Sequence, residues 1–273
     1  MNEPNNTKDT NPLGMREIGP AGPYVLPPQT CSERRKEYFL RANRVLGTYA
    51  TIAAYSGIGE KNVKISVEQN KINDEDDICI KMGSYTFQSK YRLLIKMLGK
   101  AGAQLTNQVF LMVYGNFEAY LADLVQDSFG VQGAEDSLEK AISLMASTRW
   151  EAKISKISQK CGVRLRKRDF VTAYKEIDMG FMGKAYSDPI EFLQSMADLR
   201  HRFVHSAGRV DKNLLRDYPT LGLAEGSLIE LPFGLPYEVN FFFVPMTELL
   251  DKAFCQKFGW ARHTITPEHL TDI

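Results

Sequence analysis

Two histidines and two arginines fall within six consecutive positions of one segment, DLRHRFVHSAG, which spans residues 198–208. They are Arg200, His201, Arg202 and His205, in a chain that has four histidines. Imidazole readily gives and takes protons near neutral pH, and guanidinium presents a planar set of donors to phosphoryl oxygens. The segment is therefore either the polar end of a surface helix or a place where phosphate is bound and cut.

The segment ends a helix that we expect to begin at Pro189, with Asp188 as its cap, and to stop before Gly208, just past His205. Projected at about 100° per residue, Arg200 falls near the centre of an apolar arc. The arc consists of Ile190, Leu193, Met196, Ala197, Phe203 and Val204. A guanidinium placed there either requires a carboxylate or a bound anion, or snorkels past its neighbours into solvent.

A partner for Arg200 is available on a helix expected over residues 104–129. Glu118 shares the face of that helix with four apolar residues, Leu111, Tyr114, Leu121 and Val125. Two opposite charges that each lie on an apolar face are most simply explained if they meet. We therefore expect a Glu118–Arg200 contact, which is equally compatible with a structural role.

His205 lies about 140° from Arg200 on an ideal helix, on the polar side with Asp198 and His201. The two side chains converge only if the last turn of the helix unwinds, or if two chains meet at a two-fold axis. Asp198 and Arg202, at i and i+4, are expected to form a solvated pair.

A second cluster of positive charge lies between residues 149 and 168. Four of its members recur at i, i+4, i+7 and i+11 of an expected helix: Arg149, Lys153, Lys156 and Lys160. The opposite side of the same helix carries Trp150, Ile154, Ile157 and Cys161, which we expect to face the core. A connecting loop then adds Arg164, Arg166, Lys167 and Arg168. This pattern fits binding to a nucleic-acid backbone, and taken alone it fits a solvated lysine-rich face equally well.

The run LRHRFVHSAGRVD resembles the motif of HEPN-domain proteins, helical bundles related to RNases of bacterial toxin–antitoxin and phage-defence systems. That motif is an arginine, usually followed by a polar residue, and a histidine a few positions on. Arg200, His201 and His205 match these three positions, and Gly208 and Asp211 match the style of a subgroup in which a glycine and an aspartate follow.

The segment GNFEAYLADL resembles an early helix of the same subgroup, with Glu118 in its acidic position. The resemblance covers roughly residues 104–258. It implies a metal-independent endoribonuclease without a cofactor, in which Arg200, His205 and His201 are catalytic and Glu118 and Asp198 support them. It also implies a homodimer with two motifs facing one cleft, and possible partners such as an antitoxin or another defence protein. A non-catalytic HEPN module that binds RNA or a protein partner remains the alternative.

The resemblance implies cleavage by attack of the RNA 2′-hydroxyl on the adjacent phosphate, which leaves a 2′,3′-cyclic phosphate and a 5′-hydroxyl. This reaction needs a base, an acid and positive charge near the phosphorus. His205 is the histidine expected to transfer protons, while His201 orients it or contacts RNA. One proton-transfer histidine per chain is too few for both steps, so two paired chains would supply both.

The composition is that of an ordinary globular protein of 273 residues, with 25% charged residues and a formal net charge of +1, so any surface for nucleic acid must be local. The four cysteines form no CxxC pair, and reduced thiols in the cytoplasm are expected. No apolar run approaches the roughly 20 residues that span a bilayer, so no membrane association is expected. Nucleotide-binding, serine-hydrolase and zinc signatures are absent from the sequence.

The spacing of apolar residues predicts a mainly α fold, a HEPN-like helical bundle with small β additions. We expect a disordered polar tail over 1–30, a helix and β-hairpin region over 31–103, the bundle over 104–260 and a C-terminal tail over 261–273. The expected helices are 33–55, 104–129, 134–147, 149–161, 168–178, 189–205 and 246–258. The expected strands are 62–69 and 76–83, joined by the polar turn KINDED, and 227–231.

Overall fold

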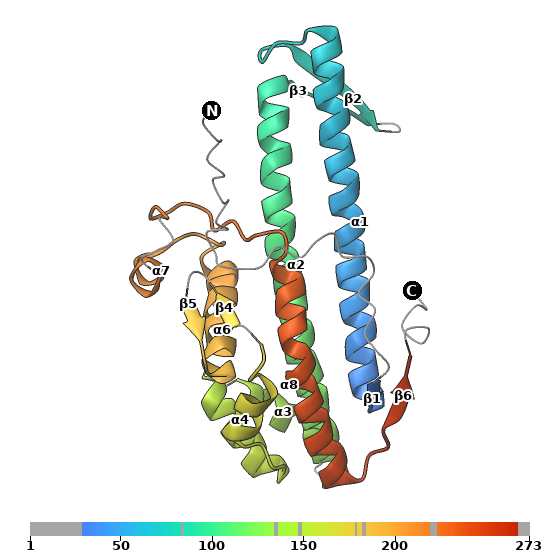
Figure 1. Cartoon of the computed structure of the whole chain (residues 1–273), viewed down its shortest axis with the longest axis vertical. Coiled ribbons are helices and arrows are strands. Elements are labelled where there is room, and N and C mark those ends of the chain that lie inside the picture. Colours follow the sequence, from blue (N-terminus) through green and yellow to red (C-terminus); the bar gives the residue numbers. More distant parts are fainter. Residues whose placement is uncertain are drawn as a thin grey trace, which may run out of the picture.

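Three long helices run side by side through the molecule (Figure 1): α1 (Glu33–Asn70), α2 (Tyr91–Val131) and α8 (Leu235–Phe258). This is a computed structural model, and it describes residues 29–82, 85–133, 136–146, 149–177, 179–181, 184–218 and 223–266. The shorter helices are α3 (Ser137–Met145), α4 (Trp150–Cys161), α5 (Lys167–Ala173), α6 (Pro189–His205) and α7 (Lys212–Asp217). The expectation of a mainly helical fold is confirmed.

The strands in the described residues form small antiparallel pairs. They are β1 (Gln29–Cys31) with β6 (His263–Ile265), β2 (Asp77–Met82) with β3 (Tyr85–Lys90), and β4 (Met179–Phe181) with β5 (Lys184–Tyr186). The β2–β3 and β4–β5 pairs join strands that are neighbours in sequence, whereas β1–β6 joins strands from the two ends of the described chain. The β2–β3 hairpin joins the far ends of α1 and α2 (Figure 1).

The core continues from α1, which contributes buried side chains such as Tyr38 and Phe39, to the opposite side of α2 and α8, where α4 and α6 lie (Figure 1). Its centre is aromatic, because Phe117 of α2 stacks on Phe243 of α8 at 4.2 Å between ring centroids and also contacts Trp150 of α4. The expected core face of α4 is confirmed by the burial of Trp150, Ile154, Ile157 and Cys161.

The hairpin expected from residues 62–69 and 76–83 is wrong in its first strand. Residues 62–69 continue α1 as a helix, and β2 instead pairs with β3, which follows it. The described side chains of this stretch are mostly exposed, and the helix continues because each residue added to an existing helix gains a hydrogen bond without the cost of nucleation. The polar turn therefore joins a helix to a strand, and there the backbone N–H of Asn73 donates to the Asp76 carboxylate at 2.7 Å.

Several helix ends also differ from expectation. α2 begins at Tyr91 and runs without a break through the boundary expected at residues 103 and 104, while α5 ends at Ala173. α8 begins at Leu235 and continues past Pro245, because its apolar side chains are buried on several sides. Residues 227–231 form no strand, and Leu228 makes only an isolated bridge to Arg209.

The two ends of the described chain are joined to each other. β1 takes its first residues from the expected N-terminal tail, and β6 lies within the expected C-terminal tail. Residues 1–28 and 267–273 of those tails, with His269, lie outside the described residues. Next to this sheet Arg35, which is 1% exposed, pairs with Glu248, and the fully buried Asp251 binds Ser32 and Arg262.

Candidate functional site

The helix that carries the histidine and arginine cluster has the bounds expected from sequence. The Asp188 carboxylate accepts a hydrogen bond from the backbone N–H of Ile190 at 2.9 Å, and Pro189 occupies the first turn of α6. At the other end Gly208 has a φ of +68°, and its N–H donates to the carbonyl of Arg202 at 3.4 Å. The cap at Asp188 and the turn at Gly208 set the bounds of α6, and the helical backbone between them sets the direction of each side chain.

The expected contact between Glu118 and Arg200 is present. Arg200 Nη2 lies 3.3 Å from Glu118 Oε2, and Lys153 Nζ lies 3.8 Å from Glu118 Oε1. One carboxylate on α2 therefore stands between a cation of α6 and a cation of α4. The Arg200 side chain is 40% exposed, so part of its guanidinium remains open to solvent.

Lys153 does not belong to a solvated stripe, which corrects the expectation from spacing. Its side chain is 6% exposed, and its Nζ lies 4.1 Å from the centre of the Trp150 ring. Burial lowers the pKa of Lys153, although the Glu118 charge opposes this shift. The reason is that α4 packs against both α2 and α6, so its buried arc is wider than one stripe of apolar residues.

A hydrogen-bonded chain of polar groups supports this cluster. The Trp150 indole N–H donates to Tyr114 Oη at 2.7 Å, and burial raises the pKa of Tyr114 well above its usual value, which keeps the phenol neutral. The Trp150 backbone N–H donates to Gln194 Oε1 at 2.9 Å, and Gln194 Nε2 donates to Asp198 Oδ1 at 2.8 Å. Asp198 is thus linked to α4 through Gln194.

The expected pair between Asp198 and Arg202 is not formed. The Arg202 side chain is 11% exposed and forms ion pairs with Asp211 and, at 3.4 Å, with Asp217. Asp211 also caps α7 by accepting from the backbone N–H of Leu214 at 2.7 Å. Because α7 folds back on the end of α6, it supplies two carboxylates that helical spacing alone does not reveal.

His201 and His205 lie together on the exposed side of α6. Their ring centroids are 4.1 Å apart and the rings are tilted by 42°. α6 stays helical through His205, so its last turn does not unwind, and Arg200 and His205 keep the roughly 140° separation of an ideal helix. One chain therefore brings together Glu118, Lys153 and Arg200, and separately the two histidines.

The other basic residues of the second cluster remain near the surface. Arg149, Lys156, Lys160 and Arg164 are exposed, and none of them forms an ion pair with another described residue. Arg166 and Arg168 pair with Asp169 at 2.9 Å and 3.7 Å, and Lys167 pairs with Asp188. Lys167 and Arg168 begin α5 and do not belong to a loop.

Sequence reasoning missed two basic residues of α8 that join this cluster. Lys252 and Lys257 line a groove together with Arg164 and Arg166 of the α4–α5 connection. They are five residues apart, about 140° around an ideal helix, so helical spacing does not join them, and only packing brings both beside residues 162–169.

Within the described ranges there is no group of three or more His, Cys, Asp or Glu side chains arranged to hold a metal ion. In the same part of the chain, no helix is both long and apolar enough to cross a membrane.

Comparison of the chain with known protein families, with curated proteins and with solved structures finds no match.

Proposed function

We propose that this chain is a metal-independent endoribonuclease of HEPN type. The observation that carries the proposal is the ion pair between Glu118 and Arg200, at 3.3 Å, on the two helices that resemble the HEPN pattern. The exposed pair formed by His201 and His205 on the same helix as Arg200 supports it. Lys153 adds a buried positive charge beside Glu118, so this carboxylate is shared between two cations and does not fully offset the charge of Arg200.

In the proposed reaction, one imidazole removes the proton of the RNA 2′-hydroxyl, and the oxygen attacks the adjacent phosphorus. The bond from phosphorus to the 5′-oxygen breaks, and a second imidazole gives that oxygen a proton. The exposed part of the Arg200 guanidinium stabilises the charge on the phosphoryl oxygens. His205 is the proposed proton-transfer residue, and His201 orients it or contacts RNA.

We propose that the protein acts as a homodimer. α6 does not bring Arg200 and His205 to one side of a single chain. Two chains related by a two-fold axis could place Arg200 of one protomer beside His205 of its partner, and both histidine pairs would then face one cleft. Exposed Val204, between these residues on α6, is available for such a contact.

The test is cleavage of total RNA by the purified protein in the presence of EDTA, with product ends identified. We expect fragments that carry 2′,3′-cyclic phosphate and 5′-hydroxyl ends, and loss of at least about a hundred-fold in rate for His205→Ala and for Arg200→Ala. His263→Ala, which changes an exposed histidine on β6, is the matched control and should retain full activity. Undiminished cleavage by folded His205→Ala would overturn the proposal.

The separation of Arg200 from His205 on one chain favours a second candidate, a HEPN-type module that binds RNA without cutting it. In that case folded wild-type protein would bind RNA and leave it intact, and His205→Ala would bind equally well. The induction of toxicity in a bacterial host offers a further distinction, because only the enzyme would produce new 5′-hydroxyl RNA ends.

A further inference from the structure

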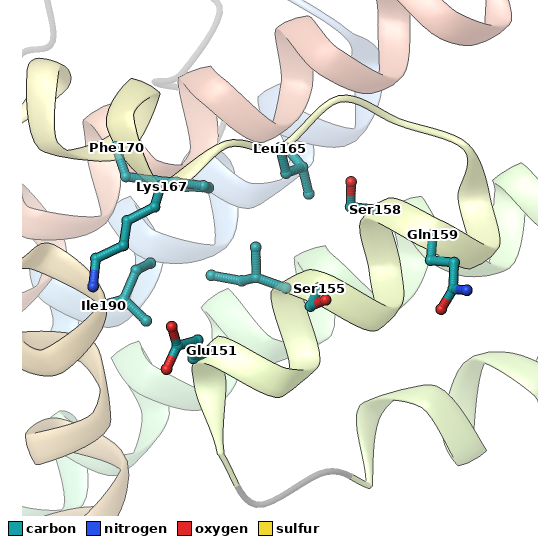
Figure 2. Close-up of a pocket in the computed structure, with 9 residues that line it drawn as sticks. Glu151, Ser155, Ser158, Gln159, Leu165, Lys167, Phe170 and Ile190 are labelled. Carbon is teal, nitrogen blue, oxygen red and sulfur yellow. The ribbon is translucent and has the colours of Figure 1, made fainter.

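A cavity of about 400 Å³ lies between α4, α5 and the first turn of α6 (Figure 2). Its volume falls in the range of small-molecule sites. The apolar lining comes from Ile154, Leu165, Phe170 and Ile190, and the polar lining from Glu151, Ser155, Ser158, Gln159 and Lys167. The cavity therefore offers an apolar surface for a flat ring and polar groups for its edge.

The polar groups of the cavity are arranged unevenly. Glu151 and Lys167 lie at the same end, next to Ile190, and Gln159 lies at the other end (Figure 2). The Glu151 side chain is exposed and forms no ion pair with another described residue. Lys167 is held by Asp188, and that hydrogen bond raises the pKa of Lys167, so its ammonium keeps its charge at this end. A carboxylate that accepts and an ammonium that donates thus stand side by side.

A basic groove of about 490 Å³ lies on the other side of the α4–α5 connection and shares Leu165 and Phe170 with the cavity. Four cations line it: Arg164, Arg166, Lys252 and Lys257. Two of them are paired, Arg166 with Asp169 at 2.9 Å and Lys252 with Glu248 at 2.8 Å. Arg164 and Lys257 form no ion pair with another described residue, so the groove can attract an anionic chain.

We propose that the cavity binds an unpaired guanine base of single-stranded RNA whose phosphates follow the basic groove. Guanine presents two neighbouring N–H donors and the O6 acceptor on its Watson–Crick edge, which match the Glu151 carboxylate and the Lys167 ammonium. The apolar lining contacts the faces of the base. A base within a duplex could not enter the cavity, so single-stranded RNA is the substrate class that fits.

This inference rests on the proposed function and adds a recognition site remote from the histidines. Ile190 lines the cavity in the first turn of α6, and His205 ends the same helix. Residues 190 and 205 are separated by about 22 Å at 1.5 Å per residue. The recognised guanine therefore lies several nucleotides away from the bond that is cut.

Binding is measured by fluorescence anisotropy with the His205→Ala protein, so that the probe stays intact. The probes are oligouridines about nine nucleotides long, with a central guanosine, a central adenosine or neither. We expect the guanosine probe to bind roughly ten-fold more tightly than the other two. Glu151→Gln replaces one of the two acceptor oxygens with an NH2 donor, which would face a guanine N–H, and Ser155→Trp fills the cavity from an exposed position. Each variant should abolish this difference and leave binding of plain oligouridine unchanged.

Glu139→Gln, an exposed carboxylate on α3, is the matched control and should keep the guanosine preference. Arg164→Ala and Lys257→Ala should weaken all three probes alike and reduce the salt dependence by about 0.7 in the log–log slope for each charge. Equal binding of the three probes, or a preference that survives both Glu151→Gln and Ser155→Trp, would overturn the inference.

The two proposals fail in different ways in these experiments. Cleavage by the wild-type protein without any guanosine preference overturns only the recognition site. A guanosine preference without cleavage by the wild-type protein overturns only the nuclease. If no probe binds, the proposal of a guanine-binding cavity is wrong. The cleavage assay then tests the proposed endoribonuclease activity separately.

Discussion

At the scale of single residues, the cluster on α6 depends on carboxylates that come from other helices. Glu118 lies between Lys153 and Arg200, while Asp211 holds Arg202. The arginines are thereby held in different ways: Arg200 stays partly exposed beside its carboxylate, and Arg202 is nearly buried. This difference fits a structural role for Arg202, and it fits the contact with a phosphate that we propose for Arg200.

Asp211 should make the stability of the protein depend on pH. Desolvation opposes ionisation, but the backbone N–H of Leu214 and the charge of Arg202 together lower its pKa below 3.8. The contribution of Asp211 is fully present above its unfolded pKa, near 4, and is lost as pH falls through the lower folded pKa.

Urea unfolding of wild type and Asp211→Asn between about pH 6 and about pH 3 checks this. The wild-type advantage should be largest above about pH 4 and should shrink below it. Because the Asp211 side chain is 39% exposed, the advantage should not exceed about 1 kcal/mol. An advantage that stays constant across this range would contradict the expected linkage.

At the scale of elements, the end of α6 is shaped by one glycine. Gly208 has a φ of +68°, and a Cβ there would lie 2.6 Å from the Phe203 ring. Phe203 in turn packs against Phe110 of α2 at 6.0 Å between ring centroids. Because it has no Cβ, Gly208 lets the backbone pass close to the Phe203 ring at the end of α6. The same ring packs α6 against α2.

Gly208→Ala should destabilise the protein by about 2–3 kcal/mol, since a left-handed φ and a displaced aromatic ring both raise the free energy of the folded state. Gly226→Ala is the matched control, because Gly226 has a φ of +80° with nothing within 4 Å of the added methyl group. It should lose only about 1 kcal/mol. Urea unfolding measures both, and equal losses would show that the Phe203 contact contributes nothing.

At the scale of the whole molecule, charged side chains tie the two ends of the described chain to each other. Asp251 of α8 is fully buried, and it binds Ser32 before α1 and Arg262 before β6, the latter at 3.0 Å. Arg262 also pairs with Glu248 at 2.9 Å. The long helices α1 and α8 are held together at this end by a small sheet and by this set of charges.

Arg262→Ala should destabilise the protein by roughly 2–3 kcal/mol, because it leaves the buried Asp251 carboxylate with Ser32 alone. The control is Arg216→Ala, whose side chain is 73% exposed and pairs with Asp217. It should change stability by no more than about 0.5 kcal/mol. Thermal and urea unfolding check the difference, and similar losses in the two variants would mean that Asp251 finds another partner.

The local sequence determined those features that depend on neighbouring residues. Asp188 and Pro189 at one end and Gly208 at the other set the bounds of α6, because capping and a left-handed φ are local requirements. The positions of Glu118 and Arg200 around their helices also sufficed to predict their contact. Each charged residue lay on an apolar face that was expected to pack against another helix.

Only the tertiary structure decided which distant segments meet. Packing of α4 between two helices buried Lys153, α7 supplied the partner of Arg202, and α8 brought Lys257 beside the α4–α5 connection. Residues 62–69 became helical against their local strand pattern for a different reason, because they extend a helix that is already formed. Helical spacing defines which way a side chain points, whereas its burial and its partner depend on the helices that pack around it.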